Sequence, residues 1–536
     1  MTAPRPPEPE FARLLGLVPE GAGADPWYRA NVPLFACADP VLERLYYYRA
    51  WVMRKHITFH ADLGISLISE FDSPEQLYWA GARNTIVCAS DHHINEARWL
   101  ADPRPAREHL RFLLTDPGAQ PRNYASALGA SALGIAEVTG DVAPATALLE
   151  ALIANHEGWR AGRTDYPHDN GFDPERGLYW NTGCDSSGEY NLASAQLNEP
   201  LRGIQGYKIR GGAGYRPDIN ADMYADLDAI ARIADAAGRR DVATTYRAEA
   251  DALRARAHAA LWDAERGFYM HRWRRDEYAD GDRHGAPSIR AGSFLWQTNA
   301  LTRGVGHQPE ADGRGRGREL TGLMPWYRGM APDTEETAAA WQTLFDPEIF
   351  DAPFGPTTAE RGDPWFSVQF DCRANGNAFP LQIARVLNGL ARMLATHRHT
   401  GGMDAAAYRR LFMRYVALQH RDGVPYLGEF HHPFEDRWVV DRPIGSHYFH
   451  SSFIDLVITG LLGLRPGLGD DLVLNPLMEE ALPFFSISGL GYHGHDIALS
   501  WDSEGARLGL RGFCVFIDGT LRHHADRPGR VTLALS

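Results

Sequence analysis

Two acidic motifs that lie far apart in the chain carry the residue types needed to cleave the bond between a sugar and its leaving group. The first, residues 181–191 (Asn-Thr-Gly-Cys-Asp-Ser-Ser-Gly-Glu-Tyr-Asn), contains Asp185 and Glu189, and the second, residues 426–430 (Tyr-Leu-Gly-Glu-Phe), contains Glu429. Hydrolysis of a glycoside needs one carboxylic acid that protonates the leaving oxygen and a second carboxylate that activates water or attacks carbon. We therefore take these three side chains as the candidate catalytic residues.

The surroundings of both motifs allow a carboxyl group to project into a cavity. Residues 181–191 are rich in Gly and Ser and follow a predicted turn and strand, and Glu429 lies between an apolar run and a loop bounded by Pro433. A loop carboxylate can also hold a turn or pair with an arginine. The residue types alone therefore leave a purely structural role open for each candidate.

Aromatic and planar polar residues near these motifs are the candidates for binding a sugar. The chain has 14 Trp, 21 Tyr and 23 Phe; the apolar C–H faces of a pyranose pack on rings, and its hydroxyls need polar partners. A core role is equally open for the aromatic candidates outside the motifs, and a bracing role for the buried polar ones. The predicted substrate-binding residues are Tyr78, Trp79, Asp91, His92, Trp180, Arg216, Asn220, Asn375, His447, Tyr448 and His450.

No pattern in the sequence predicts a metal or another cofactor. Asp91, His92 and His93 are neighbours on a predicted helix, where adjacent side chains diverge by about 100°, so they do not form one metal-binding face. His431 and His432 lack a third ligand at a suitable spacing, and the five Cys are scattered without a Cys-x-x-Cys pair. We expect neither a zinc cluster nor a disulfide framework, although loop oxygens leave a structural Ca²⁺ open.

Amphipathic helices recur along most of the chain and must position these residues. The apolar pattern predicts helices over 83–100, 124–138, 223–237, 241–262, 381–394, 404–420 and 453–462. Residues 173–180 (Asp-Pro-Glu-Arg-Gly-Leu-Tyr-Trp) and 263–270 (Asp-Ala-Glu-Arg-Gly-Phe-Tyr-Met) are similar, and each predicts a turn followed by a short strand. Paired helices joined by such turns favour a mostly α fold, an (α/α)6 toroid with long loops.

The texture changes near residue 466 to short apolar runs, at 472–474, 497–499, 508–510, 514–517 and 531–535, separated by turn signals. This predicts a lead-in segment over 1–35, a helical catalytic domain over 36–465 and a small C-terminal β module over 466–536.

Net charge limits the possible partners. The charge is −14 and we find no basic stripe, so we expect no nucleic-acid binding. The first ten residues have no apolar run and no stretch of about 18 apolar residues occurs, so we expect no signal peptide, no membrane span and a cytoplasmic protein. The expected partner is a small-molecule carbohydrate; an oligomer stays possible.

The order of the motifs resembles that of the (α/α)6-toroid glycoside hydrolases that include trehalases, processing α-glucosidases and mannosylglycerate hydrolases. In that clan a Ser-Gly-x-Asp type motif carries the general acid, and a later Gly-Glu-aromatic motif carries the general base. The similarity covers roughly residues 45 to 465. The segments that carry it are Ser-Gly-Glu-Tyr-Asn at 187–191, Gly-Glu-Phe at 428–430, the His- and Phe-rich segment 447–456, residues 214–226, and the loops 354–358 and 375–380.

The resemblance implies an inverting, exo-acting hydrolase that releases a terminal α-glucosyl or α-mannosyl group. Glu429 would then be the general base, and the general acid would be Glu189 or Asp185, because Tyr190 stands where the clan has its Asp. The residues between Leu192 and Gly212 look like an inserted loop that reshapes the pocket. Alternatives are a toroid phosphorylase, which would replace the carboxylate base by a phosphate site, a polysaccharide lyase, and a carbohydrate-binding protein without catalysis.

Overall fold

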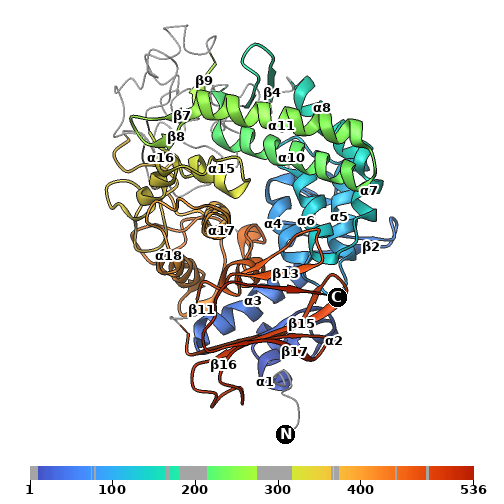
Figure 1. The fold of residues 1–536 in the computed structure, drawn as a ribbon, viewed down its shortest axis with the longest axis vertical. Coiled ribbons are helices and arrows are strands. Elements are labelled where there is room, and N and C mark those ends of the chain that lie inside the picture. The colour runs from blue at the N-terminus through green and yellow to red at the C-terminus, as the bar shows by residue number, and fades with distance from the viewer. Residues whose placement is uncertain are drawn as a thin grey trace.

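The computed structural model describes residues 10–73, 75–77, 80–163, 170–181, 214–274, 317–363, 366, 368, 374–440, 443–478 and 482–535. Helices are the main regular structure of this part of the chain, as the sequence predicts (Figure 1). Strands β14 to β17 lie at one end of the molecule, beside the N-terminal helices α1 (Phe11–Leu15) and α2 (Pro26–Asn31). No described helix combines the length and the apolar character needed to cross a bilayer.

One set of helices, which we call the circuit helices, forms a closed series of contacts. Each contacts the next in chain order, and the last contacts the first. Helices α10 and α17 have buried residues around most of their circumference, as expected for helices packed on all sides. The circuit helices are α4 (Ser90–Ala97), α6 (Leu128–Thr139), α10 (Pro217–Ala236), α15 (Met324–Tyr327), α17 (Pro380–Thr396) and α19 (Ile454–Leu456), which continues as the π-helix η9 (Val457–Leu461).

A second set, the covering helices, alternates with the first along the chain, and apart from α3, in which every residue from Leu45 to Met53 is buried, its long helices bury mainly one face. Helix α11 buries Tyr246, Ala250, Leu253, Ala257 and Leu261, the spacing of a single amphipathic stripe. The covering helices are α3 (Pro40–His56), α5 (Arg104–Thr115), α8 (Leu149–Ala161) with the short α7 (Ala143–Ala147), α11 (Arg240–Leu261), α16 (Glu335–Ala338) with η7 (Ala339–Phe345), and α18 (Ala405–Leu418).

The connections between the two sets differ in length in a way that locates the functional end. Helix α10 is joined to α11 by residues 237–239, whereas α18 is joined to α19 by residues 419–453 and α11 to α15 by residues 262–323. Each connection into a circuit helix is therefore longer than the connection out of it, and the long loops collect at the N-terminal ends of the circuit helices. Long loops on a rigid scaffold are where binding and catalytic residues usually lie.

Two of these long loops begin with the hairpins predicted from the repeated Asp-x-Glu-Arg-Gly motif. Strand β4 (Asn170–Asp173) pairs with β5 (Leu178–Asn181), and β7 (Trp262–Asp263) pairs with β8 (Phe268–Tyr269). The carboxylates of Asp173 and Asp263 each accept the backbone N–H groups two and three residues later. Both turns therefore have the same physical origin. Strands β6 (Gly214–Tyr215) and β9 (Arg272–Trp273) extend the first hairpin into a four-stranded sheet.

The strands at the C-terminal end form two antiparallel sheets. The larger has the order β1-β14-β15-β16-β17, and the smaller the order β12-β13-β18. Their bounds are β1 (Leu34–Cys37), β14 (Phe484–Tyr492), β15 (His495–Asp502), β16 (Gly512–Ile517), β17 (Thr520–Ala525), β12 (Leu464–Arg465), β13 (Asp471–Leu474) and β18 (Val531–Ala534).

The predicted lead-in differs from the structure in two ways. Residues 11–31 form α1, the short helix η1 (Pro19–Ala24) and α2, and Leu34–Cys37 is an edge strand of the larger C-terminal sheet, in the register Leu34 to Ser488. The N-terminal segment is thus folded and belongs with the β module. A local pattern does not reveal such a pairing, because its partner strand lies about 450 residues away in the sequence.

Several predicted elements differ from the structure in extent; α6 begins at Leu128 and not at residue 124, and α10 begins at Pro217 and not at residue 223. Arg83 and Asn84 have φ of 57°, which ends any helix, so the helix predicted over 83–100 begins at Ser90. No strand forms at 508–510, because the carboxylate of Asp502 accepts the N–H groups of Gly505, Arg507 and Leu508 and holds this segment as a loop.

Candidate active site

The loop that carries Glu429 is fixed to the N-terminal end of α17. It follows the hairpin of β10 (His420–Arg421) and β11 (Val424–Pro425). His431 and Ala378 exchange backbone hydrogen bonds of 2.9 and 3.0 Å, and the ring of Phe430 stacks on Phe379 at 4.1 Å. Glu429 directly precedes these contacts and is 8% exposed. The backbone on one side of this carboxylate is therefore held by a circuit helix.

Gly428 is needed because an indole ring packs against its backbone. A Cβ atom at this position would lie 2.7 Å from a ring carbon of Trp438, and Trp438 is itself anchored by a 3.0 Å hydrogen bond from Nε1 to the carbonyl of His420. Such a contact is shorter than van der Waals packing permits. The Gly-Glu dipeptide thus allows Trp438 to press on the loop directly before Glu429.

Two predicted binding residues lie beside Glu429. Nε2 of His450 donates to the carbonyl oxygen of Glu429 at 3.3 Å, and the ring of Tyr448 lies 4.9 Å from that of His450. A carbonyl only accepts, so Nδ1 of His450 is the unprotonated nitrogen. Burial lowers the pKa of His450 to about 3, which keeps the ring neutral at ordinary pH.

His447 forms part of the wall of the same corner. It has a φ of 58°, uncommon for a residue with a side chain. The hydroxyl of Tyr48 accepts the N–H of Leu427 at 2.9 Å and lies within hydrogen-bond distance, 2.8 Å, of Nδ1 of His447. The ring also packs against Trp51 at 5.0 Å. This side chain is therefore held by the covering helix α3.

His92 and Asp91, at the start of α4, reach the same end of the molecule but are largely used by protein partners. Nδ1 of His92 accepts the N–H of Ser452 at 3.1 Å, so its proton is on Nε2, 3.8 Å from Oδ1 of Asp91. The carboxylate of Asp91 pairs with Arg385 at 2.8 Å and with Arg328 at 3.1 Å. These charges hold its pKa well below the usual range despite its burial. The contacts of Asp91 favour a bracing role.

Asn220, in the first turn of α10, braces the end of β5. Its Oδ1 accepts the N–H of Tyr179 at 2.9 Å, and its Nδ2 donates to the carbonyls of Tyr179 and Arg216 at 2.9 and 2.8 Å. The amide has two donors and is bonded at both, so these contacts favour bracing over sugar binding. Arg216 is 1% exposed and precedes the same helix.

The other predicted residues fall partly within this region. Trp180 is half-buried on β5, and the guanidinium carbon of Arg274 lies 4.3 Å from its ring centroid. Asn375 is buried just before α17. Strand β5 ends at Asn181, which pairs with Gly214. Four predicted residues lie outside the described residues: Tyr78, Trp79, Asp185 and Glu189.

Sequence reasoning missed a buried network of charges between the circuit helices. Arg328 bonds Asp222 at 2.6 Å as well as Asp91, so helices α4, α10 and α17 are joined through two arginines and two carboxylates. Glu96 is a second example, since it accepts the N–H of Ile454 at 3.0 Å and so caps α19. No local pattern marks these residues, because their partners are brought close only by the fold.

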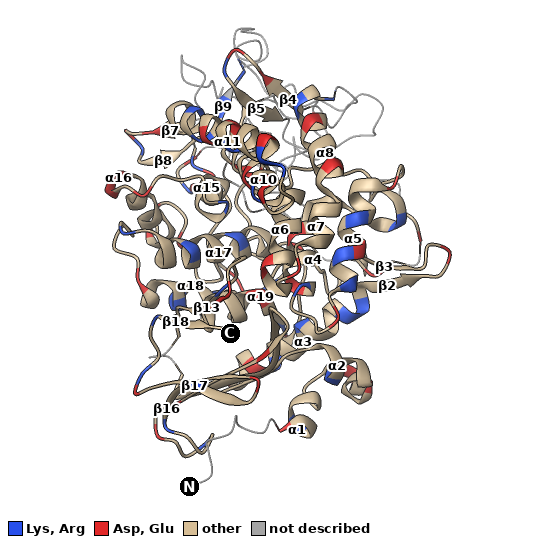
Figure 2. Cartoon of the chain, turned by 45° about the vertical axis from the view of Figure 1, so that its right-hand side comes forward, with Lys and Arg blue, Asp and Glu red and all other residues tan. Residues whose placement is uncertain are grey.

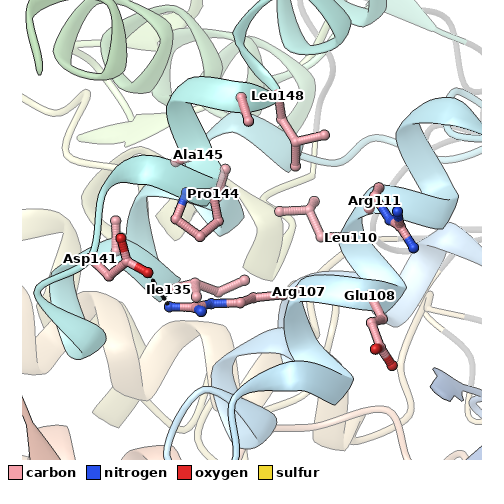
Figure 3. A pocket seen from close by; sticks show the side chains of 12 residues that line it. Arg107, Glu108, Leu110, Arg111, Ile135, Asp141, Pro144, Ala145 and Leu148 are labelled. Carbon is pink, nitrogen blue, oxygen red and sulfur yellow. Dashed lines mark hydrogen bonds and ion pairs between the residues drawn. The ribbon is translucent and has the colours of Figure 1, made fainter. Parts of the chain in front are cut away.

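Two of the described cavities differ in their relation to this site. A cavity of about 670 Å³ is lined by Phe71, whose ring contacts Tyr448, together with polar residues such as Lys55 and Arg83. A cavity of about 300 Å³ lies among α5, α6 and α7, away from the Glu429 loop, with an ion pair of 3.1 Å between Arg107 and Asp141 at its edge (Figure 3). Among the described residues, no group of three or more His, Cys, Asp and Glu side chains is arranged to hold a metal ion.

The family model described as "Mannosylglycerate hydrolase MGH1-like glycoside hydrolase domain" matches residues 82–451 of this chain. The match includes the first acidic motif, the Glu429 loop, and all the predicted binding residues except Tyr78 and Trp79.

Solved structures extend the similarity of the fold. A structure described as "Sialidase" is 26% identical with a TM-score of 0.81, over 97% of this chain and 44% of the other, so this chain spans less than half of that protein's length. The family 63 mannosylglycerate hydrolase of Thermus thermophilus, in complex with Tris, is 14% identical with a TM-score of 0.50, over 76% of this chain and 98% of the other. A family 78 rhamnosidase of a Bacillus species is 15% identical with a TM-score of 0.53, over 88% of this chain and 40% of the other.

Proposed function

The chain belongs to the mannosylglycerate hydrolase MGH1-like glycoside hydrolases and is a glycosidase, and from this premise we propose that it is an inverting, exo-acting enzyme with Glu429 as its general base. We further propose that the alternating circuit and covering helices form an (α/α)6 toroid. The closed series of helix contacts and the family 63 and 78 structures with the same fold support this architecture.

The observation that carries the proposal is the position of Glu429. Its loop is fixed to the start of α17, it is flanked by Tyr448 and His450, and it lies at the end of the circuit helices where the long loops collect. Because the described part of this corner is largely buried, a carboxylate here would act on a water molecule shielded from bulk solvent. Backbone held by α17 on one side and packed by Trp438 on the other would keep that water in line with the anomeric carbon.

The reaction then needs a proton at the leaving oxygen. In the proposed mechanism Glu189 or Asp185 protonates the glycosidic oxygen as the C–O bond breaks. Glu429 takes a proton from the water that attacks the opposite face of the sugar, through a transition state resembling an oxocarbenium ion. The two carboxyl groups should be roughly 6.5–9.5 Å apart to accommodate that water. If Asp185 and Glu189 lie close together, repulsion between two negative charges raises the pKa of one of them and keeps it protonated.

We propose an α-glucosyl or α-mannosyl group of a small glycoside as the substrate. The similarity to the mannosylglycerate hydrolase named above supports a small glycoside, anionic or neutral, as the substrate. The proposed sugar-binding residues are Tyr78, Trp79, Trp180, Arg216, Asn375, His447, Tyr448 and His450; for Asp91, His92 and Asn220 we propose positioning roles. The contacts of Asp91 and Asn220 with other protein groups are the reason for this division.

The test compares two glutamates of the same loop on a panel of α- and β-aryl glycosides, trehalose, glucosylglycerate and mannosylglycerate. Glu429→Gln should lower kcat at least about 100-fold, the usual contribution of a general base, with little change in KM. Glu435→Gln is the matched control, because Glu435 is 59% exposed and pairs with Arg437. Turnover by Glu429→Gln at the wild-type rate would remove Glu429 as the base and favour a phosphorylase or a lyase.

The acid is assigned with the variants Glu189→Gln and Asp185→Asn. A variant that lacks the general acid should lose activity on alkyl glycosides but keep it on aryl glycosides with a good leaving group, because such a group departs without protonation. The variant of the other residue should affect both substrate classes alike. Equal loss by both variants on both classes would exclude either residue as the sole acid.

A further inference from the structure

A cavity of about 450 Å³ lies at the C-terminal end of the circuit helices, opposite the candidate active site. All six circuit helices contribute to its lining, and residues around β12, β13 and the start of β18 close it. Figure 2 shows β13 and β18 next to α17 and α19. Arg392, which lines the cavity, lies 12 residues after Pro380, about 18 Å along α17 from the end that holds Glu429. This cavity is therefore not part of the proposed sugar site.

Positive charge dominates its lining. Three of the arginines have carboxylate partners: Arg98 pairs with Asp455 at 2.8 Å, Arg232 with Glu137 at 2.6 Å, and Arg328 with Asp222 at 2.6 Å. Asp228 is the third carboxylate of the lining, after Glu137 and Asp455. The six arginines of the lining are Arg98, Arg232, Arg328, Arg392, Arg465 and Arg530.

The remaining three arginines have no carboxylate within ion-pair distance among the described residues. Within the described residues, Arg530 donates to the carbonyl of Ala395 at 3.3 Å. Nε and Nη2 of Arg465 are buried without an acceptor in the described part of the chain. The pKa of Arg465 is lowered to about 10, mainly by burial, with the positive charges of Arg392 and Arg530 acting in the same direction and Tyr408 and Asp455 opposing them. Arg465 is thus close enough to feel the positive charges of both Arg392 and Arg530.

In the described part of the chain, the buried polar atoms of the lining residues that lack a hydrogen-bond partner are all donors. Besides those of Arg465, they are Nε of Arg98 and Nδ2 of Asn388. A buried donor without an acceptor costs about 1–3 kcal/mol, more if it is charged. Arginines near helix C-termini also offset the helix dipole, as Arg530 does at the end of α17. Offsetting the dipole does not give Arg465 or Asn388 a hydrogen-bond acceptor. A bound ligand rich in acceptor oxygens would provide one.

We propose that this cavity binds a small oxyanion, either inorganic phosphate or the phosphate group of a small phosphorylated metabolite. Arginine binds phosphate through pairs of parallel N–H groups, so Arg392, Arg465 and Arg530 would converge on one anion. The volume leaves room for a sugar-sized group beside the phosphate. The site goes beyond the proposed hydrolase activity, because none of its arginines is a candidate catalytic or sugar-binding residue.

The test is calorimetric titration of the full chain with inorganic phosphate, at constant ionic strength kept with chloride. The wild type should show one saturable site, and Arg392→Gln should weaken binding at least tenfold. Arg392 is exposed in the cavity and has no ion pair among the described residues, so this variant should fold normally. Arg256→Gln, a change of an exposed arginine on the covering helix α11, is the matched control and should bind as the wild type does.

Further variants separate this site from the active site and identify the ligand. Glu429→Gln should keep full phosphate affinity, and phosphate should raise the Tm of the wild type but not of Arg392→Gln. A hexose phosphate that binds at least tenfold more tightly than inorganic phosphate would identify a phosphorylated metabolite as the ligand, and equal affinity would identify the free anion. The absence of a saturable site, or equal binding by Arg392→Gln and the wild type, would overturn the proposal.

Discussion

Lowering the pH from 7 to 5 should destabilise this protein, because the fold buries several histidines in their neutral form. Burial lowers the pKa of His93 and His450 to about 3 and that of His56 to about 4. His93 donates to the carbonyl of Phe449 at 2.6 Å through Nε2 and stacks on its ring. Protonation of any of these rings would place a charge where no carboxylate pairs with it directly among the described residues.

The sign follows from the two states. The folded pKa of each ring is below the unfolded value of about 6.5, so the unfolded chain binds more protons, and stability falls as the pH drops below 6.5 toward the folded pKa. Between pH 7 and 5 each of these histidines then lowers the free energy of unfolding of the protein by about 2 kcal/mol. Glu96 has the opposite effect, because burial raises its pKa to about 7, which adds about 2 kcal/mol over the same interval. The net loss from these four groups alone is about 4 kcal/mol, a large share of the roughly 5–15 kcal/mol that stabilises a domain, and the lowered pKa values of His271 and His431 act in the same direction.

Urea unfolding followed by tryptophan fluorescence at pH 7, 6 and 5 measures this loss. His93→Gln removes one titrating group, so between pH 7 and 5 the unfolding free energy should depend on pH less steeply by about 1 kcal/mol per pH unit. His524→Gln, a change of an exposed histidine, should leave the slope as it is in the wild type. A midpoint that stays constant from pH 7 to 5, or a wild-type slope in His93→Gln, would refute the reasoning.

Three substitutions test the contacts around the site. Gly428→Ala should lower kcat at least tenfold and destabilise the protein by about 1–3 kcal/mol, measured by steady-state kinetics and Tm, because its Cβ would overlap Trp438; unchanged kinetics would show that the loop adjusts freely. Asp91→Asn should lower the free energy of unfolding by about 3–5 kcal/mol, because it removes the buried carboxylate that Arg385 and Arg328 share. A variant with the wild-type Tm would contradict this. Trp180→Leu should raise KM roughly fivefold, the equivalent of about 1 kcal/mol of ring contact, with kcat unchanged; an unchanged KM would remove this ring from the sugar site.

The periodic parts of the fold could be predicted from the sequence. Helices α10, α11, α17 and α18 follow from apolar stripes that are complete within each segment, and the repeated Asp-x-Glu-Arg-Gly turns follow from local hydrogen bonds of Asp173 and Asp263. Two features that the local sequence does not encode could not be predicted. The pairing of β1 with β14 depends on a distant part of the chain, and the left-handed backbone at Arg83 and Asn84 is not marked by the apolar pattern.

The same division holds for the site. The Gly-Glu-Phe motif was recognisable because its residue types are tied to a chemistry, and the structure places it with Tyr448 and His450. Asn220 shows where prediction of a role from residue type ends. A polar residue at this end of the circuit helices can bind sugar or brace a strand, and only its three hydrogen bonds favour the second role.

The central claim is that Glu429 directs water to the face of the sugar opposite the leaving group. Proton NMR of the first turnovers, recorded before mutarotation, measures this directly with an α-linked substrate from the panel. The account predicts that the β-anomer of the free sugar appears first with wild-type enzyme, and that its rate of appearance falls at least about 100-fold in Glu429→Gln. Release of the α-anomer first would contradict it, because retention requires a covalent glycosyl-enzyme intermediate and a carboxylate acting as nucleophile.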